Sequence, residues 1–230
     1  MLAAMGLQIR SATPADAEAV AKLHLASYRA AYQGLLPAAV LASLRAEDRE
    51  QRWQASLNDP QRHTLIAADG EAGSPPIGFA EVGPSRDDDA GAGTGELIAL
   101  HVAQAQWRQG LGRTLTRMAM ATLAADGFSA ATLWVLTGNS RARAFYQAMS
   151  WHPDGAAREF PAWGIRVPEV RYRTAWQLLG QQRANLNLTD GLALLGLERV
   201  FGPARGPVAR QREQVTVGEP GFEGRADRFH

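Results

Sequence analysis

The sequence contains no cysteine, and it is poor in lysine and histidine. The missing cysteines exclude disulfide scaffolds, thiolate nucleophiles and cysteine-ligated metal sites together. Lys22 is the only lysine among 24 basic residues, so Schiff-base catalysis is not expected. The five histidines show no His-x-x-x-His spacing, so the sequence does not suggest a zinc site.

Neither sign of charge dominates, and no long apolar run is present. The 24 basic and 23 acidic residues leave a net charge of +1, so neither nucleic acid nor an anionic membrane is expected as a partner. No apolar stretch approaches the roughly 20 residues that span a bilayer. The opening MLAAMGLQIR lacks the charged and apolar regions of a secretory signal. We therefore expect a cytoplasmic protein, and its 46% apolar content is ample for a packed core.

Strand and helix signals alternate over residues 1–176. Thr13 is a plausible N-cap for the first helix, with Pro14 at the first helical position and Asp16 placed to reach back to the cap. Strands are expected at 7–10, 63–69, 75–83, 96–102, 130–136 and 167–176. Helices are expected after Thr13, from Pro37 to Leu57, from Gly110 to the left-handed cap Gly127, and after Asn139. This order predicts a mixed α/β sheet.

The composition changes after Trp176. Residues 177–230 are rich in Gly, Pro, Arg and Glu, with one apolar patch, LALLGLERVF. We expect a largely irregular C-terminal extension with a short amphipathic helix near 190–201. A dimerisation arm is the alternative, which leaves a homodimer open.

The segment RQGLGR, which follows the apolar strand ELIALHV, has the form of a phosphate site. A strand that turns directly into a helix leaves backbone N–H groups and the positive end of the helix dipole facing one space. Gly110 and Gly112 would let a phosphate approach the backbone, and Arg108 and Arg113 would add charge-assisted bonds. The alternative is that the glycines only permit a tight turn or close packing.

A second motif, NSRARAFYQAMSW, follows the next strand. Together the two segments resemble the acetyl-CoA-binding core of the GNAT superfamily of acyltransferases, and the resemblance extends over residues 7–176. Asn139, Ala142, Phe145 and Tyr146 match the second signature of that superfamily. Two positions depart from it: Trp107 replaces a Gln or Arg, and Ser150-Trp151 replaces Gly-Phe. A left-handed Ser150 would cost about 1–2 kcal/mol relative to glycine.

The resemblance implies a largely antiparallel sheet, flanked by helices, in which the fourth and fifth strands splay apart and admit the pantetheine arm of acetyl-CoA. The implied activity is acetyl transfer to a primary amine of a small molecule or peptide, by direct attack in a ternary complex without a metal. A non-catalytic acyl-CoA sensor is the alternative. The residues expected to bind acetyl-CoA are Leu100, Val102, Arg108, Gln109, Gly110, Leu111, Gly112, Arg113 and Asn139, with the N–H near Leu100 facing the thioester oxygen.

Two side chains are expected to move protons. By the resemblance, Tyr146 donates to the departing thiolate, and an unperturbed tyrosine keeps its proton at neutral pH. Glu96 stands fourteen positions before Gly110, the spacing of the general base in histone-acetylating members. A solvated strand-start carboxylate is the alternative for Glu96, in which case Glu81, water or, less well placed, His101 takes the amine proton.

The acceptor remains open at this stage. The resemblance places Tyr28, Tyr32 and Trp53 in helices that line the acceptor groove, although they are equally suited to packing. The acidic run Asp87–Asp89 is expected to lie in a solvated loop.

Overall fold

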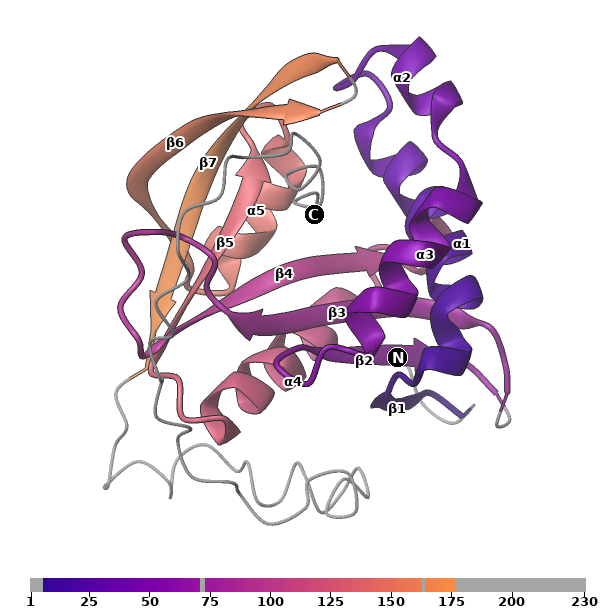
Figure 1. Cartoon of the computed structure of the whole chain (residues 1–230), viewed down its shortest axis with the longest axis horizontal. Coiled ribbons are helices and arrows are strands. Elements are labelled where there is room, and N and C mark those ends of the chain that lie inside the picture. Colours follow the sequence, from indigo (N-terminus) through magenta and orange to yellow (C-terminus); the bar gives the residue numbers. More distant parts are fainter. Residues whose placement is uncertain (1–5, 71–72, 163, 177–230) are drawn as a thin grey trace, which may run out of the picture.

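The computed structural model describes residues 6–70, 73–162 and 164–176. The α-helices and strands, in order, are β1 (Gln8–Ser11), α1 (Ala17–Tyr32), α2 (Ala38–Ser43), α3 (Ala46–Leu57), β2 (His63–Ala68), β3 (Pro76–Pro84), β4 (Thr94–Val102), α4 (Leu111–Ala125), β5 (Ala130–Leu136), α5 (Ser140–Ala148), β6 (His152–Ala162) and β7 (Ile165–Ala175), and short 3-10 helices precede α1 (Pro14–Asp16) and α4 (Gln104–Gln106). Figure 1 shows their arrangement. None of the helices in these residues is long and apolar enough to cross a membrane.

The strands form one seven-stranded sheet in the order β1-β2-β3-β4-β5-β7-β6. Every neighbouring pair is antiparallel except β4 and β5, which run parallel. Helices α1 and α3 cover one face of β2–β4, and α4 covers the other (Figure 1). The predicted mixed sheet flanked by helices is therefore confirmed.

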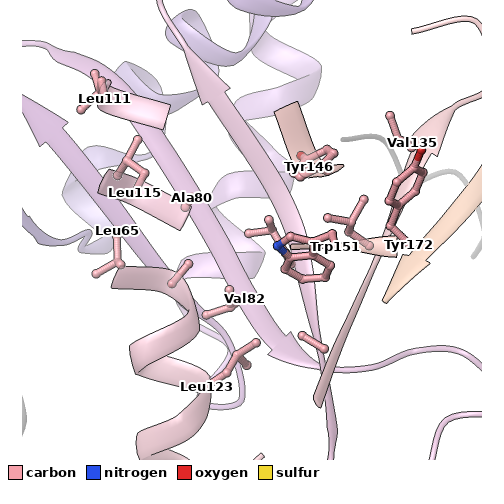
Figure 2. Close-up of a cluster of buried hydrophobic side chains, with 14 of the residues drawn as sticks. Leu65, Ala80, Val82, Leu111, Leu115, Leu123, Val135, Tyr146, Trp151 and Tyr172 are labelled. Atoms are coloured by element: carbon pink, nitrogen blue, oxygen red, sulfur yellow. The ribbon is translucent and has the colours of Figure 1, made fainter. Parts of the chain in front are cut away.

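The two faces of the sheet follow the alternation of the strands. In β2, Leu65 packs toward α4 while Ile66 packs toward α1 and α3. The α4 side forms the larger core, which Trp151 and Tyr172 extend toward α5 and β7 (Figure 2). Burying apolar residues on both faces fixes the register, because a one-residue shift would exchange the two faces.

Local signals placed most helix ends correctly. The Asp16 carboxylate accepts from the Thr13 N–H at 2.8 Å, and the Asn139 side chain accepts from the Ala142 N–H at 3.1 Å. Gly127 is left-handed, with φ 88°, after the last turn of α4. Ser150 is also left-handed, with φ 63°, and takes the strained conformation that glycine would hold more easily.

Two predictions of elements were wrong. The single helix expected from Pro37 to Leu57 is two helices, α2 and α3, because the chain is extended at Leu44, whose side chain is buried and whose carbonyl accepts from Arg29 at 2.8 Å. Strand β6 was not expected. It lies at the edge of the sheet, where its prolines and Gly155 are tolerated because edge strands need fewer ladder hydrogen bonds.

The expectations for residues 177–230, including the extension and its short helix, fall outside the described residues.

Candidate active site

Strands β4 and β5 pair over only three positions and then separate. Their register runs from Thr94 opposite Ala130 to Glu96 opposite Thr132, while β5 pairs with β7 along its whole length. On its other side β4 stays paired with β3, with a bulge that leaves Ile98 as an extra residue. The second half of β4 therefore faces a gap in the sheet, which confirms the predicted splay of the fourth and fifth strands.

A cavity of about 830 Å³ opens in this gap, and we call it the fork cavity. It is bounded by the second half of β4, the end of β5, the loop before α4, and α5. The residues of the predicted set that line it are Leu100, Val102, Arg108, Gly110, Gly112, Arg113, Asn139 and Tyr146. Eight side chains or backbone segments chosen from sequence thus meet around one space.

The turn into α4 is open toward the fork cavity. Gly110, the N-cap, has φ 91°, and a Cβ built there meets nothing within 4 Å. A Cβ on Gly112 would only reach ordinary contact, 3.6 Å from the Phe145 ring. Close packing therefore does not require Gly112, in contrast to Gly95, where a Cβ would lie 2.7 Å from Leu123. The space beside the first N–H groups of α4 suits a phosphate.

Two of the residues expected to bind acetyl-CoA, Gln109 and Leu111, do not line the fork cavity. The Leu111 side chain is buried in the core on the α4 face, and the Gln109 amide donates to the Ala105 carbonyl at 2.8 Å. Of the charged side chains expected at this turn, Arg108 and Arg113 both line the fork cavity.

Trp107, the departure from the family signature, has a structural role. Its indole N–H donates to the Val102 carbonyl at 2.9 Å and fastens the end of β4 to the turn. The Arg141 guanidinium lies 3.6 Å from the centre of the indole ring, and both line the fork cavity. The substitution therefore keeps a positive charge beside the cavity, supplied from α5.

Tyr146 lies in the wall of the fork cavity. It is 7% exposed and packs edge-on against Phe145 and Trp151, with ring centroids 5.3 and 6.2 Å away. Burial raises the pKa of Tyr146, so the hydroxyl stays protonated at neutral pH. Tyr146 is thus a packing aromatic, with a protonated hydroxyl, that also lines the gap between the strands.

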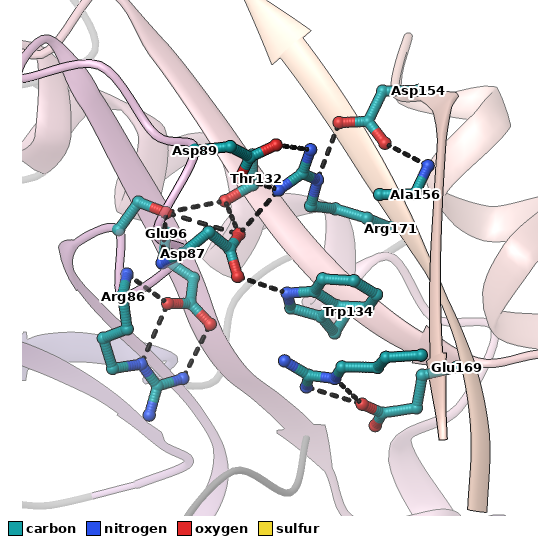
Figure 3. A network of polar contacts seen from close by, with 12 residues as sticks. Arg86, Asp87, Asp89, Glu96, Thr132, Trp134, Asp154, Ala156, Glu169 and Arg171 are labelled. Carbon is teal, nitrogen blue, oxygen red and sulfur yellow. Dashed lines mark hydrogen bonds and ion pairs between the residues drawn. The ribbon is translucent and has the colours of Figure 1, made fainter. Parts of the chain in front are cut away.

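Glu96 lies apart from the fork cavity. Its side chain is 1% exposed and is held by the Arg86 guanidinium, with Nη2–Oε1 at 2.6 Å and Nε–Oε2 at 2.9 Å (Figure 3). The Arg86 backbone N–H donates to the same carboxylate at 3.2 Å. The expectation of a solvated strand-start carboxylate does not describe this residue, and neither large cavity is lined by it.

A second cleft, of about 680 Å³, lies between α3 and the sheet, and we call it the α3 cleft. Ile98 and Ala99 of β4 line it, directly before the residues that line the fork cavity. Glu81 also lines it. Its carboxylate is 5% exposed, accepts from the Ser56 hydroxyl and lies 3.4 Å from Arg62 Nη1.

A pair of buried histidines stands between the two cavities. His24 of α1 lines the α3 cleft, His101 of β4 lines the fork cavity, and their ring centroids are 4.5 Å apart. His101 Nδ1 lies 3.1 Å from the Ser27 hydroxyl. His101 faces α1 while Leu100 packs on the α4 side, as the alternation of β4 predicted.

The three aromatic residues expected near the acceptor lie in three different places. Tyr28 is fully buried and lines neither large cavity, whereas Tyr32 lines the fork cavity and Trp53 the α3 cleft. Trp53 also donates to His24 Nδ1 at 3.2 Å.

The expectation of a solvated loop at Asp87–Asp89 holds for Asp88 and Asp89, which are exposed, but not for Asp87. Asp87 is 7% exposed and accepts from the Trp134 indole at 2.9 Å, and Asp89 binds Arg171 at 2.6 and 2.7 Å (Figure 3). Arg171 also binds Asp154 at 2.7 Å. The acidic run anchors the β3–β4 loop to β5 and β7, because a strand-borne arginine supplies the counter-charge.

Comparison with known proteins agrees with this geometry. The profile described as the Acetyltransferase (GNAT) family matches residues 22–151. The chain is 35% identical over 164 residues to "Uncharacterized N-acetyltransferase YuaI" of Bacillus subtilis, covering 70% of this chain and 89% of that protein. It is 33% identical over 171 residues to "Probable N-acetyltransferase Rv2775" of Mycobacterium tuberculosis, covering 73% and 92%.

Solved structures show the same fold. PaiA N-acetyltransferase from Thermoplasma acidophilum, crystallised in complex with coenzyme A, superposes with a TM-score of 0.56 at 20% identity, covering 75% of this chain and all of that one. A GCN5-related N-acetyltransferase from Kribbella flavida gives 0.55 at 24% identity, covering 74% and 98%.

Proposed function

The chain belongs to the GNAT family of acetyltransferases, and on that premise we propose that it transfers acetyl from acetyl-CoA to a primary amine by direct attack in a ternary complex. The observation that carries the proposal is the fork cavity, with an open glycine turn at one end and Tyr146 in its wall. The α3 cleft, which adjoins it along β4, is the proposed acceptor site.

The coenzyme is proposed to lie along the second half of β4. Its pyrophosphate would meet the N–H groups at the start of α4, with Arg108 and Arg113 adding charge. Its pantetheine arm would pair with β4 like a missing strand, and the thioester oxygen would face the N–H near Leu100. Asn139 caps α5 beside this path and lines the same cavity.

The amine nitrogen attacks the carbonyl carbon, and the carbon–sulfur bond breaks. Tyr146 gives its hydroxyl proton to the departing sulfur and regains one from water, since burial favours its neutral form. No covalent enzyme intermediate is needed. The amine must also lose a proton, and this is the step for which several groups compete.

The main candidates for the acceptor of the amine proton are Glu96, Glu81 and water. The spacing to Gly110 favours Glu96, as in the histone-acetylating members. The contacts favour Glu81 or water, because Glu81 lines the α3 cleft whereas the Glu96 carboxylate is paired with Arg86. His101, between the cavities, is the weaker alternative.

Acetyl-CoA binding tests the first part of the proposal. At a concentration near 100 times Kd the ligand should stabilise the fold by about 2.7 kcal/mol, which raises Tm by about 5–10 °C in a chain of this size. Gly110→Glu should abolish the shift, because it fills the turn and adds a negative charge. Gly127→Glu is the matched control: its φ of 88° is equally strained and its surroundings equally open, but it lies at the other end of α4.

Turnover tests the second part. Thiol release from acetyl-CoA, measured across a library of primary amines, should depend on both substrates. A thermal shift without thiol release from any amine would support the sensor instead of the enzyme. If acetyl-CoA does not raise the Tm of the parent protein, both the enzyme and the sensor proposals are wrong.

A further inference from the structure

Arg49 of α3 is a buried cation without a described counter-ion. It is 6% exposed and lines the α3 cleft. Within the described residues no carboxylate lies in salt-bridge range of it, and its Nε has no hydrogen-bond partner. Its contacts are the Tyr28 ring, 4.9 Å from the guanidinium carbon, and His24 Nε2, 3.4 Å from Nη1. A buried charge in this state is strongly unfavourable.

His24 does not neutralise this charge. A neutral imidazole has one acceptor nitrogen, and both Trp53 Nε1 and Arg49 Nη1 are obligate donors. In the tautomer whose Nδ1 accepts from Trp53 at 3.2 Å, the ring proton stands on Nε2, the nitrogen that faces Arg49; in the other tautomer Nε2 accepts from Arg49 but carries no charge. A protonated His24 would add a second cation. In no protonation state does His24 supply a negative charge, so a counter-ion for Arg49 must come from another source.

The other charged residues of the α3 cleft do not neutralise Arg49, which is the buried cation of this cleft. Glu81 and Asp59 share the Arg62 guanidinium, at 3.4 Å and 3.3 Å respectively. Arg45 and Arg52 are exposed at the rim, on the same side as Asp48. One unpaired guanidinium can be neutralised by one monoanion. Desolvation lowers the pKa of Arg49, and a bound anion would offset this effect.

We infer that the acceptor amine carries a carboxylate, which binds Arg49 in the α3 cleft. The inference rests on the proposed function, since it takes this cleft as the acceptor site. His24 touches Arg49 on one side, and on the other its ring centroid is 4.5 Å from that of His101, which lines the fork cavity. Carboxylate and amine must therefore be close together in one molecule, as in an amino acid.

Kinetics with matched substrates test the inference. The probes are α-amino acids and their methyl esters, which keep the amine and side chain and lose only the charge. The parent enzyme should use at least one acid roughly 10- to 100-fold better than its ester in kcat/KM, the worth of one charge-assisted hydrogen-bonded pair. The less basic amine of the ester supplies more free nucleophile at neutral pH, so intrinsic reactivity favours the opposite order.

Arg49→Met should bring the acid-to-ester ratio close to one, and Arg117→Met, on the exposed face of α4, should leave it unchanged. In a thermal scan without amine, Arg49→Met should melt at or above the parent Tm, because it removes an uncompensated buried charge. If Arg49 were purely structural, held by its contact with Tyr28, Arg49→Met would instead lower Tm and leave the acid-to-ester ratio unchanged.

The acid-to-ester comparison in the parent needs no variant, so a misfolded Arg49→Met cannot rescue the inference. Equal use of acids and esters, or turnover of amines without any preference for a carboxylate, overturns the inference and leaves the proposed acetyl transfer standing. Absence of thiol release from every amine overturns both.

Discussion

The Glu96–Arg86 pair allows a sharp separation of a structural from a catalytic role. Glu96→Gln keeps the size of the side chain and removes its charge, so Arg86 loses the carboxylate that holds it through two charge-assisted hydrogen bonds. Both partners are shielded, with side chains 1% and 20% exposed. We expect the main effect of this substitution to be a loss of stability.

The size of the loss follows from the burial. Removing one partner of a buried ion pair costs about 3–5 kcal/mol, and the partial exposure of Arg86 puts this pair near the lower limit, about 3 kcal/mol. For a chain of this size that corresponds to a fall in Tm of about 6–12 °C. Arg86→Gln should lose a similar amount, and the double variant should recover much of it because no charge is left unmatched.

Thermal scans of the four proteins give the coupling energy, and kcat/KM against pH gives the chemistry. We expect the profile of Glu96→Gln to keep the parent shape once the folded fraction is accounted for, while Glu81→Gln loses activity below the pKa of the amine. A Glu96→Gln enzyme with the parent Tm and a loss of kcat/KM confined to low pH would refute this reasoning and return the base to Glu96.

Three further predictions concern other parts of the chain. Tyr146→Phe should keep the acetyl-CoA thermal shift and lower kcat by about 10²- to 10⁴-fold, and a parental kcat would reduce the tyrosine to packing. His63 lies 3.0 Å from Asp126, which raises the pKa of His63, so His63→Gln should lose stability at about pH 5.5 and little at about pH 8.5. Both side chains are about 40% exposed, so the difference should be about 0.5 kcal/mol, and equal losses at both pH values would contradict it. Deleting 182–230 should leave acetyl-CoA binding and the mass by light scattering unchanged, unless that segment assembles the protein.

The parts of the fold that the sequence predicted depend on neighbours in the chain. The reach of Asp16 back to Thr13, the cap at Asn139 and the left-handed Gly127 are each complete within a few residues. Strand β6 could not be predicted in this way, because it depends on pairing with β7 and its own residues include Pro153 and Gly155. The break before α3 is likewise set by burial of Leu44, which no local pattern announces.

The same division runs through the candidate site. The turn at Gly110 was predictable because the end of the strand, the glycines and the start of the helix lie close together in the sequence. Arg49, His24 and His101 come from α3, α1 and β4, and only packing of the two helices on the sheet brings them together. Asp87 was misjudged for the same reason, since its partner Arg171 lies on β7.

The acidic loop also explains where the sheet opens. The last paired positions of β4 and β5 are Glu96 and Thr132, both 1% exposed. Consecutive loop residues engage them: Arg86 binds Glu96, and Asp87 accepts from the Thr132 hydroxyl at 3.4 Å (Figure 3). The buried charge of Glu96 thus sits at the closed end of the fork, where it is matched by Arg86. Beyond this point β5 follows β7 and β4 follows β3. Glu96 therefore helps to hold β4 and β5 together where the gap begins, and its contact with Arg86 fixes its position. For this reason the effect of Glu96→Gln on stability should be measured before its effect on rate.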